Sequence, residues 1–180
     1  MKRNKILTDL KLYLQQDPVE RKMVADMIAF VAQNPDCFDR SNTAGHLTGS
    51  AWIMSKDLTK TLLIHHVKLN KWLQPGGHCD GNPDCMAVAL NEALEETGLA
   101  VTPLFPGIFD VDIHLIPAKG DVAAHLHYDV RYAVYAEDDG NEIGPNTEIN
   151  EAQWVPLDVV HEYNDEQSIM RMVLKAKAFR

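Results

Sequence analysis

The amino-acid sequence predicts an α/β fold in which helices pack against a mixed β-sheet. Polar and apolar residues alternate over residues 109–116 and again over 124–135, as expected for strands with one buried face. Residues 83–97 and 157–178 instead carry apolar residues at helical spacing, so each segment has a face that can pack. Elements that bury one face each are stable as stacked layers. We therefore expect an α/β/α sandwich with one of these helical segments on each side of the sheet.

Length, composition and charge narrow the class of protein. A chain of 180 residues with 46% hydrophobic and 24% charged residues has ordinary globular composition. Its net charge of −9 excludes a broad basic surface for nonspecific nucleic-acid binding. No apolar run reaches the roughly 20 residues of a membrane span, and Asp9 and Lys11 interrupt any signal-like core. Three cysteines without a CxxC pair favour reduced thiols. We expect a cytoplasmic protein with no nucleic-acid or membrane partner.

The N-terminal part of the chain reads as a helical extension. Residues 3–34 show helical periodicity in two pieces, separated at Asp17-Pro18. We assign residues 1–42 to this extension and residues 43–180 to the main domain. Packing against the core is the simpler role for the two helices. A lid over substrate or a homodimer surface is the alternative.

Two further strands are expected before the central helix. Residues 46–54 and 59–67 are apolar enough for strands and are joined by a short turn at 55–57. His65 and His66 are neighbours in the second strand, so they point to opposite faces of it. They cannot both serve one site, and neither is assigned a catalytic role.

The segment 76–98 predicts a glycine-rich loop followed by a short acidic helix. Asn82 can cap the free amide groups of the first turn, and Pro83 suits the first helical position. Gly98 suits the position just after the helix.

Three glutamates share one face of this helix. At 100° per residue, Glu92, Glu95 and Glu96 lie together, and the apolar residues fall on the opposite side: Met86, Ala87, Leu90, Ala93 and Leu94. Like charges this close repel unless a divalent cation binds them, and Mg²⁺ or Mn²⁺ favours carboxylate oxygens. A solvated acidic face is the alternative, but the preceding Gly-Gly loop favours a site.

This segment resembles the Nudix box, G-x5-E-x7-R-E-U-x-E-E-x-G-U, in which U is apolar. Residues 92–99 match the second half at every position, and Gly77 falls at the leading glycine. Pro83 and Asn91 replace the glutamate and arginine that commonly pair as a brace in the family. The resemblance implies a Nudix-like domain with Mg²⁺ or Mn²⁺ as cofactor.

The same resemblance implies roles for particular residues. Glu95 and Glu96 would be metal ligands, and Glu92 a ligand or general base. The carbonyl of Gly76 would be a further ligand. In the family an extra base or ligand can come from outside the box, which makes Glu148 and Glu151 candidates. Ordinary surface charge is the alternative for those two.

Histidines and acids line one face of the two alternating strands. The first strand places Asp110, Asp112 and His114 on this face, and the second places His125, His127, Asp129 and Arg131 there. Solvated strands rarely carry so many metal-capable groups, so we assign this face, with His78, to substrate binding. Arg131 or a histidine would meet a phosphate, and Asp129 would orient a neighbour. Exposure to water is the alternative. A zinc site from His78, Cys79 and Cys85 is conceivable, but its spacing is unusual.

Together these features imply a metal-dependent hydrolase that cleaves a diphosphate linkage in a nucleoside diphosphate derivative or related organic pyrophosphate. Its partner would be that small-molecule substrate. Because of Pro83 and Asn91, the alternative is a Nudix-like nucleotide or sugar-phosphate binding or regulatory module without efficient turnover. An enzyme similar to isopentenyl diphosphate isomerase ranks below both, because its cysteine motif is missing.

Overall fold

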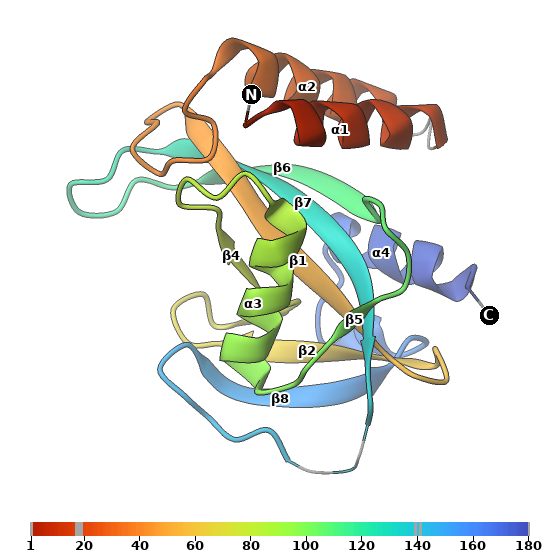
Figure 1. Ribbon diagram of the computed structural model, residues 1–180. Helices are drawn as coiled ribbons and strands as arrows, with labels where there is room; N and C mark the ends of the chain where they lie inside the picture. The colour runs from red at the N-terminus through yellow and green to blue at the C-terminus, as the bar shows by residue number, and fades with distance from the viewer. Residues whose placement is uncertain (1, 17–19, 139, 141, 180) are drawn as a thin grey trace. The chain divides into compact units, whose positions relative to one another are not determined.

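The structure is a computed structural model that describes residues 2–16, 20–138, 140 and 142–179 (Figure 1). The predicted interruption at Asp17-Pro18 lies outside the described residues. The chain forms two compact units, and several helices and strands contribute residues to both. The first unit comprises residues 1–50, 77–89 and 107–132, and the second comprises 51–76, 90–106 and 133–180.

Two helices form the N-terminal part of the first unit, as predicted. Helices α1 (Asn4–Gln16) and α2 (Arg21–Gln33) lie side by side (Figure 1). The Arg3 guanidinium donates hydrogen bonds to the carbonyls of Val31 and Ala32, both at 2.8 Å. Phe30 of α2 stacks on Tyr128 with 3.8 Å between ring centroids. The extension is therefore packed against a strand of its own unit.

Strands of the first unit carry the predicted polar face. Strand β6 (Asp110–Ile116) pairs antiparallel with β7 (His125–Ala136). The register places the polar positions of the two strands opposite each other: Asp110 with Arg131, Asp112 with Asp129, and His114 with His127. This register confirms that the alternating polar residues of β6 and β7 share one face, as predicted.

Strand β1 (Gly45–Ser55) lies beside β7 in the strand order. The Leu126 amide donates to the carbonyl of Ala44 at 3.2 Å, and Asp129 bonds Thr48 and Ser50 further along. Residue numbers rise together along both strands, so β1 and β7 run parallel. Because β6 and β7 are antiparallel, the sheet is mixed, as predicted. Strand β4 (Gly76–His78) pairs with β1.

The second unit is built around β2 (Lys60–His66), which pairs antiparallel with β8 (Ile149–Pro156) over most of its length (Figure 1). Leu62, Leu63 and Ile64 of β2 are at most 1% exposed, in agreement with the apolar strand predicted over 59–67. The strand order is β3-β2-β1-β7-β5, with β8 pairing with β2. The two strands at the ends of this order are short: β3 (Lys71–Leu73) and β5 (Thr102–Pro103).

Helix α3 (Cys85–Thr97) begins two residues later than predicted. Asp84, not Asn82, caps it: the Asp84 carboxylate accepts the Ala87 amide at 3.3 Å. The Asn82 side chain instead accepts the amide of Asp84 at 3.0 Å, in a turn before the helix. Pro83 belongs to that turn. Gly98 follows the helix with φ +73°, as predicted for a left-handed C′ residue.

The predicted apolar face of α3 is only partly correct: Ala93 is buried, but the buried side of the helix is shifted away from Leu94. Leu94 is 50% exposed, whereas Glu96 is only 3% exposed. The fully buried positions belong to small residues: Cys85, Ala89 and Ala93. A Cβ on Gly49 of β1 would lie 2.4 Å from the carbonyl oxygen of Cys85, so the first turn approaches β1 backbone to backbone. Small side chains permit such close packing, and the buried stripe that they define continues to Glu96.

A short and a longer helix end the chain, both within the segment 157–178 that was predicted to be helical. They are η1 (Val160–Glu162) and α4 (Gln167–Lys177). Lys177 pairs with Asp158 at 2.6 Å. Within the described part of the chain, none of the helices has the length and apolar content that crossing a membrane requires.

Candidate metal and substrate site

Three carboxylates converge in the second unit. Glu92 and Glu96, one turn apart on α3, and Glu148 each offer an oxygen within 4.8 Å of the other two. We call this group the carboxylate cluster. Glu92 is half-buried, Glu96 is buried and Glu148 is exposed, so the cluster opens to solvent on one side. Two of its members belong to the predicted box, and the third is the predicted extra ligand.

Asn146 holds the third carboxylate in place. Its side-chain oxygen accepts the amides of Glu148 at 2.8 Å and Ile149 at 3.0 Å. Its side-chain nitrogen donates to the main-chain carbonyl of Glu96 at 3.0 Å. These three bonds tie the start of β8 to the C-terminal turn of α3. Sequence reasoning missed Asn146, whose only signal is that it stands two residues before a candidate ligand, as in an Asx turn.

The pKa of the Glu96 carboxyl is strongly raised. Burial raises its pKa to about 8, and the charges of Glu92, Glu148 and Glu95 act in the same direction. The Gly76 amide partly opposes this by donating to Glu96 Oε2 at 3.0 Å. A cation held by the cluster would favour the ionised form. The structure thus shows Gly76 orienting Glu96 through its N–H group, whereas the prediction concerned its carbonyl.

Glu95 lies outside the carboxylate cluster. It is exposed and lines a cavity of about 400 Å³ with Glu96, Glu142, Asn146 and Trp154. Glu151 is also exposed and stands opposite His65 in the β2–β8 register. Of the five predicted acids, the structure therefore groups three and places Glu95 beside them at the cavity.

The donor set of the cluster suits a hard divalent cation. Oxygen ligands from a few carboxylates, completed by water and substrate phosphates, are typical of Mg²⁺ and Mn²⁺ sites. Without a cation, three close carboxylates repel, and this repulsion adds to the effect of burial in raising the pKa of Glu96. The residues present fit the ion that the sequence predicts.

Asp129 and Arg131, predicted to bind substrate, form a buried network in the first unit. Asp129 accepts hydrogen bonds from Thr48 at 2.9 Å, from Ser50 at 2.7 Å and from Arg131 Nε at 2.7 Å. Both Asp129 and Arg131 are 3% exposed. Asp129 therefore holds the side chain of Arg131 in place.

The guanidinium of Arg131 faces three carboxylates. Besides Asp129, it reaches Asp110 at 3.1 Å and Asp112 at 3.5 Å. Burial would lower the pKa of Arg131, but these acids outweigh that effect and raise it. Because Arg131 of β7 pairs with acids of both strands, it holds β6 against β7.

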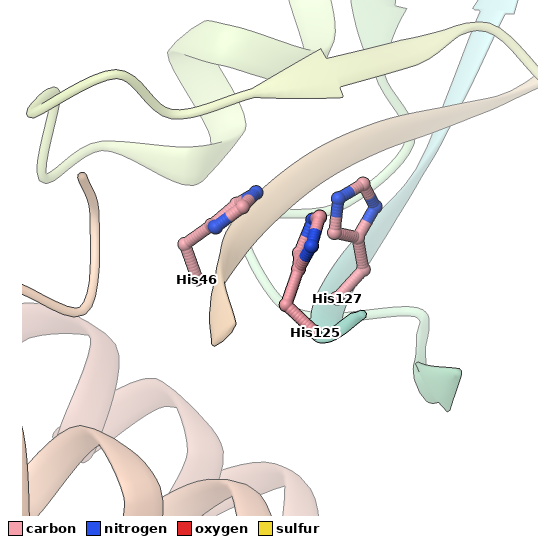
Figure 2. A group of neighbouring side chains, drawn as sticks. All are labelled: His46, His125 and His127. Carbon is pink, nitrogen blue, oxygen red and sulfur yellow. The ribbon is translucent and has the colours of Figure 1, made fainter. Parts of the chain in front are cut away.

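The predicted histidines gather in the first unit together with one that was not predicted. His46, His125 and His127 each offer a ring nitrogen within 4.8 Å of the others (Figure 2). We call these three residues the histidine cluster. The His78 ring is 5.0 Å from that of His46 and 4.9 Å from that of His127. The sequence places His46 in a strand, but only the pairing of β1 with β7 brings it to His125 and His127.

Burial favours the neutral form of three of these imidazoles, those of His46, His78 and His127. Burial lowers the pKa of His127 to about 3 and that of His78 to about 4. Burial also lowers the pKa of His46, with His125 acting in the same direction and the backbone of Asn42 opposing it. Neutral imidazoles are available as metal ligands.

The alternative zinc site from His78, Cys79 and Cys85 does not form among the described residues. The two sulfurs are 3.5 Å apart and buried, whereas His78 packs with the other histidines. The cysteines instead fill space at the start of α3.

Comparisons with known proteins identify the family. A family model described as NUDIX domain matches residues 46–175. The chain therefore belongs to the Nudix hydrolase family, as the resemblance of its central segment predicted. A search of curated proteins found no match.

Solved structures agree on the fold. A NUDIX family hydrolase from Clostridium perfringens is 24% identical, with a TM-score of 0.55 over 75% of this chain and 98% of its own. An Ap4A hydrolase from C. elegans is 17% identical, with a TM-score of 0.58 over 74% and 96%. A UDP-X diphosphatase, 15% identical with a TM-score of 0.54, covers 98% of this chain and 92% of its own. The predicted Nudix fold is thus confirmed.

Proposed function

We propose that this protein hydrolyses a diphosphate linkage in a nucleoside diphosphate derivative or a related organic pyrophosphate. The observation that carries the proposal is the convergence of Glu148 on the two box glutamates Glu92 and Glu96 within 4.8 Å. Membership of the Nudix family supports the class of reaction. The family match begins at residue 46, which supports the proposed division into an extension, 1–42, and a Nudix domain, 43–180.

Mg²⁺ or Mn²⁺ is the proposed cofactor, held by Glu92, Glu96 and Glu148. When bound, such an ion neutralises phosphate charge and lowers the pKa of water. Glu96 is oriented for this role by the Gly76 amide, and Glu148 by Asn146. Oriented ligands of this kind raise metal affinity because less freedom is lost on binding.

The cavity beside the cluster is the proposed substrate site. Its volume of about 400 Å³ lies within the range of small-ligand pockets, about 300–1,000 Å³. Glu95 is exposed at this cavity, where its carboxylate can accept the proton of an attacking water or add a ligand. Trp154 offers an aromatic surface on which a nucleobase can stack.

The test is a panel of nucleoside diphosphate sugars, dinucleoside polyphosphates, nucleotide cofactors and nucleoside triphosphates. Release of phosphate or nucleotide is measured with Mg²⁺, with Mn²⁺ and with EDTA. We expect metal-dependent cleavage of one class of compound and its loss in Glu96→Gln. Glu96→Gln keeps the acceptor for the Gly76 amide, so the fold should survive. Near-normal turnover in this variant would refute the assignment.

A binding or regulatory module is the second candidate. It is motivated by Pro83, which lies in the turn before α3, and by Asn91, which is exposed on the helix. These residues replace the pair that braces the box in the family. This candidate predicts saturable nucleotide binding, measured by thermal stabilisation, without any metal-dependent product. Detection of turnover would exclude it.

A further inference from the structure

We propose that His46, His125 and His127 form a binding site for a divalent transition metal, with Zn²⁺ as the preferred ion. The three residues belong to the first unit, and the site is additional to the carboxylate cluster of the second unit. Figure 2 shows the three rings together beside the strands that carry them.

Backbone geometry, rather than flexible side chains, assembles the site. His46 is the second residue of β1, and His125 and His127 are the first and third residues of β7. Alternate residues of a strand share a face, so His125 and His127 point the same way. The Leu126 amide bonds the carbonyl of Ala44, which fixes the start of β7 beside the start of β1. The three imidazoles are therefore brought together before any ion binds.

Three buried ring nitrogens of this cluster lack hydrogen-bond partners among the described residues. His46 is 2% exposed, and among the described residues neither its Nδ1 nor its Nε2 meets a partner with normal geometry. His127 Nε2 is also buried and has no hydrogen-bond partner among the described residues. Buried polar atoms are nearly always bonded, because leaving one unsatisfied costs free energy. A metal ion would take up the one lone pair of each neutral imidazole and so satisfy one nitrogen of His46 and Nε2 of His127.

His125 shows how one ring is prepared. Its Nδ1 lies 2.9 Å from the carbonyl oxygen of Ala123. A carbonyl only accepts, so Nδ1 carries the proton and Nε2 keeps its lone pair. Metal-binding histidines commonly donate their second nitrogen to a carbonyl in this way, which fixes the tautomer and the ring orientation.

The ligand set selects the class of metal. Neutral imidazole suits Zn²⁺ and other first-row transition ions, whereas Mg²⁺ prefers carboxylate, carbonyl and water oxygens. Three histidines leave a fourth position of a tetrahedral site for water or another ligand. His78 is the candidate fourth ligand, because its ring lies about 5 Å from those of His46 and His127.

The experiment is a Zn²⁺ titration of the full-length protein after treatment with EDTA, in competition with a chromophoric chelator. Wild type should bind one equivalent that excess Mg²⁺ does not displace. His125→Ala and His127→Ala should weaken this binding at least about 100-fold. Co²⁺ should give the intense visible absorption of a tetrahedral site in wild type and lose it in both variants.

Matched controls separate this site from the carboxylate cluster and from general effects. His161→Ala removes an exposed histidine of the second unit and should leave Zn²⁺ affinity unchanged. Glu96→Gln should also leave it unchanged. His125 is only half-buried, so its variant should fold even if a variant of His46 does not, and circular dichroism checks this. Unchanged affinity in folded His125→Ala and His127→Ala, or its loss in Glu96→Gln, would overturn the proposal.

Discussion

The carboxylate cluster and the histidine cluster each gather three possible metal ligands, but burial shifts the pKa values of their side chains in opposite directions. Each brings three ligand groups within 4.8 Å. In the first, burial and like charges raise the pKa of Glu96 to about 8, so the acid resists ionisation. In the second, burial lowers the pKa of His127 to about 3, so the base resists protonation. The comparison teaches that burial prepares histidines for a metal but leaves a carboxylate dependent on one.

The largest expected effect concerns Glu148, the proposed metal ligand from outside the box. Glu148→Gln should lower metal-dependent hydrolysis by about 100-fold or more, because it removes a charged ligand from the carboxylate cluster. Steady-state kinetics at saturating Mg²⁺ measure this effect. Glu151→Gln, on an exposed strand position nearby in sequence, is the matched control and should stay close to wild type. Equal losses in both variants would contradict the distinction.

The two clusters should limit stability at opposite ends of the pH range in metal-free protein. Between about pH 4.5 and 8, folded Glu96 holds a proton that the unfolded chain releases, so its contribution to stability is lost as pH rises. Between about pH 6.5 and 3, unfolded His127 takes up a proton that the folded protein excludes, so stability is lost as pH falls.

Denaturant unfolding in EDTA measures this dependence. Glu96→Gln should remove the alkaline loss, raising the free energy of unfolding at pH 8 by about 1–3 kcal/mol and leaving the acid limb unchanged. An unaltered alkaline limb would show that Glu96 ionises normally in the fold.

The hydrogen bonds by which Asn146 positions Glu148 can be tested without disturbing the histidine cluster. Asn146→Ala should weaken Mg²⁺ or Mn²⁺ affinity of the carboxylate cluster by about 10–100-fold, because Glu148 loses its positioning bonds. Zn²⁺ affinity of the histidine cluster should not change. Isothermal titration of each ion into the variant makes the comparison, and a parallel fall in both affinities would point to general unfolding.

The smallest effect should come from the cavity wall. Trp154→Ala removes an aromatic surface worth about 1 kcal/mol to a stacked base, so KM should rise about fivefold. Metal affinity and kcat should stay near wild type. Trp72→Ala, which removes a tryptophan outside this cavity lining, should leave KM unchanged. An unaltered KM in the Trp154 variant would show that no nucleobase stacks on Trp154.

Sequence reasoning succeeded where the information is local. Alternation over 109–116 and 124–135 predicted the shared polar face of β6 and β7, because the period of a strand depends only on its own residues. The box motif predicted the family for the same reason. The helical end at Gly98 follows from a backbone conformation that glycine adopts easily.

Sequence reasoning failed where the burial or the neighbours of a residue depend on how the helices and strands pack. Leu94 is exposed and Glu96 buried because α3 packs through small residues, and hydrophobicity alone favours the opposite face. His46 and Asn146 are functional candidates only through partners that are distant in sequence. The substrate role of Arg131 looked reasonable from charge alone, but pairing of β6 with β7 surrounds it with acids.

Asn146 also bears on how such a protein can change. Its three hydrogen bonds fix Glu148 relative to the end of α3 from a point that follows the 137–145 connection. Glu142, Ile143 and Gly144 of that connection line the cavity. Insertions or deletions upstream of Asn146 should therefore alter the lining of the proposed substrate cavity while preserving the geometry of the carboxylate cluster. The fold separates a part that can diversify from a part that must stay constant.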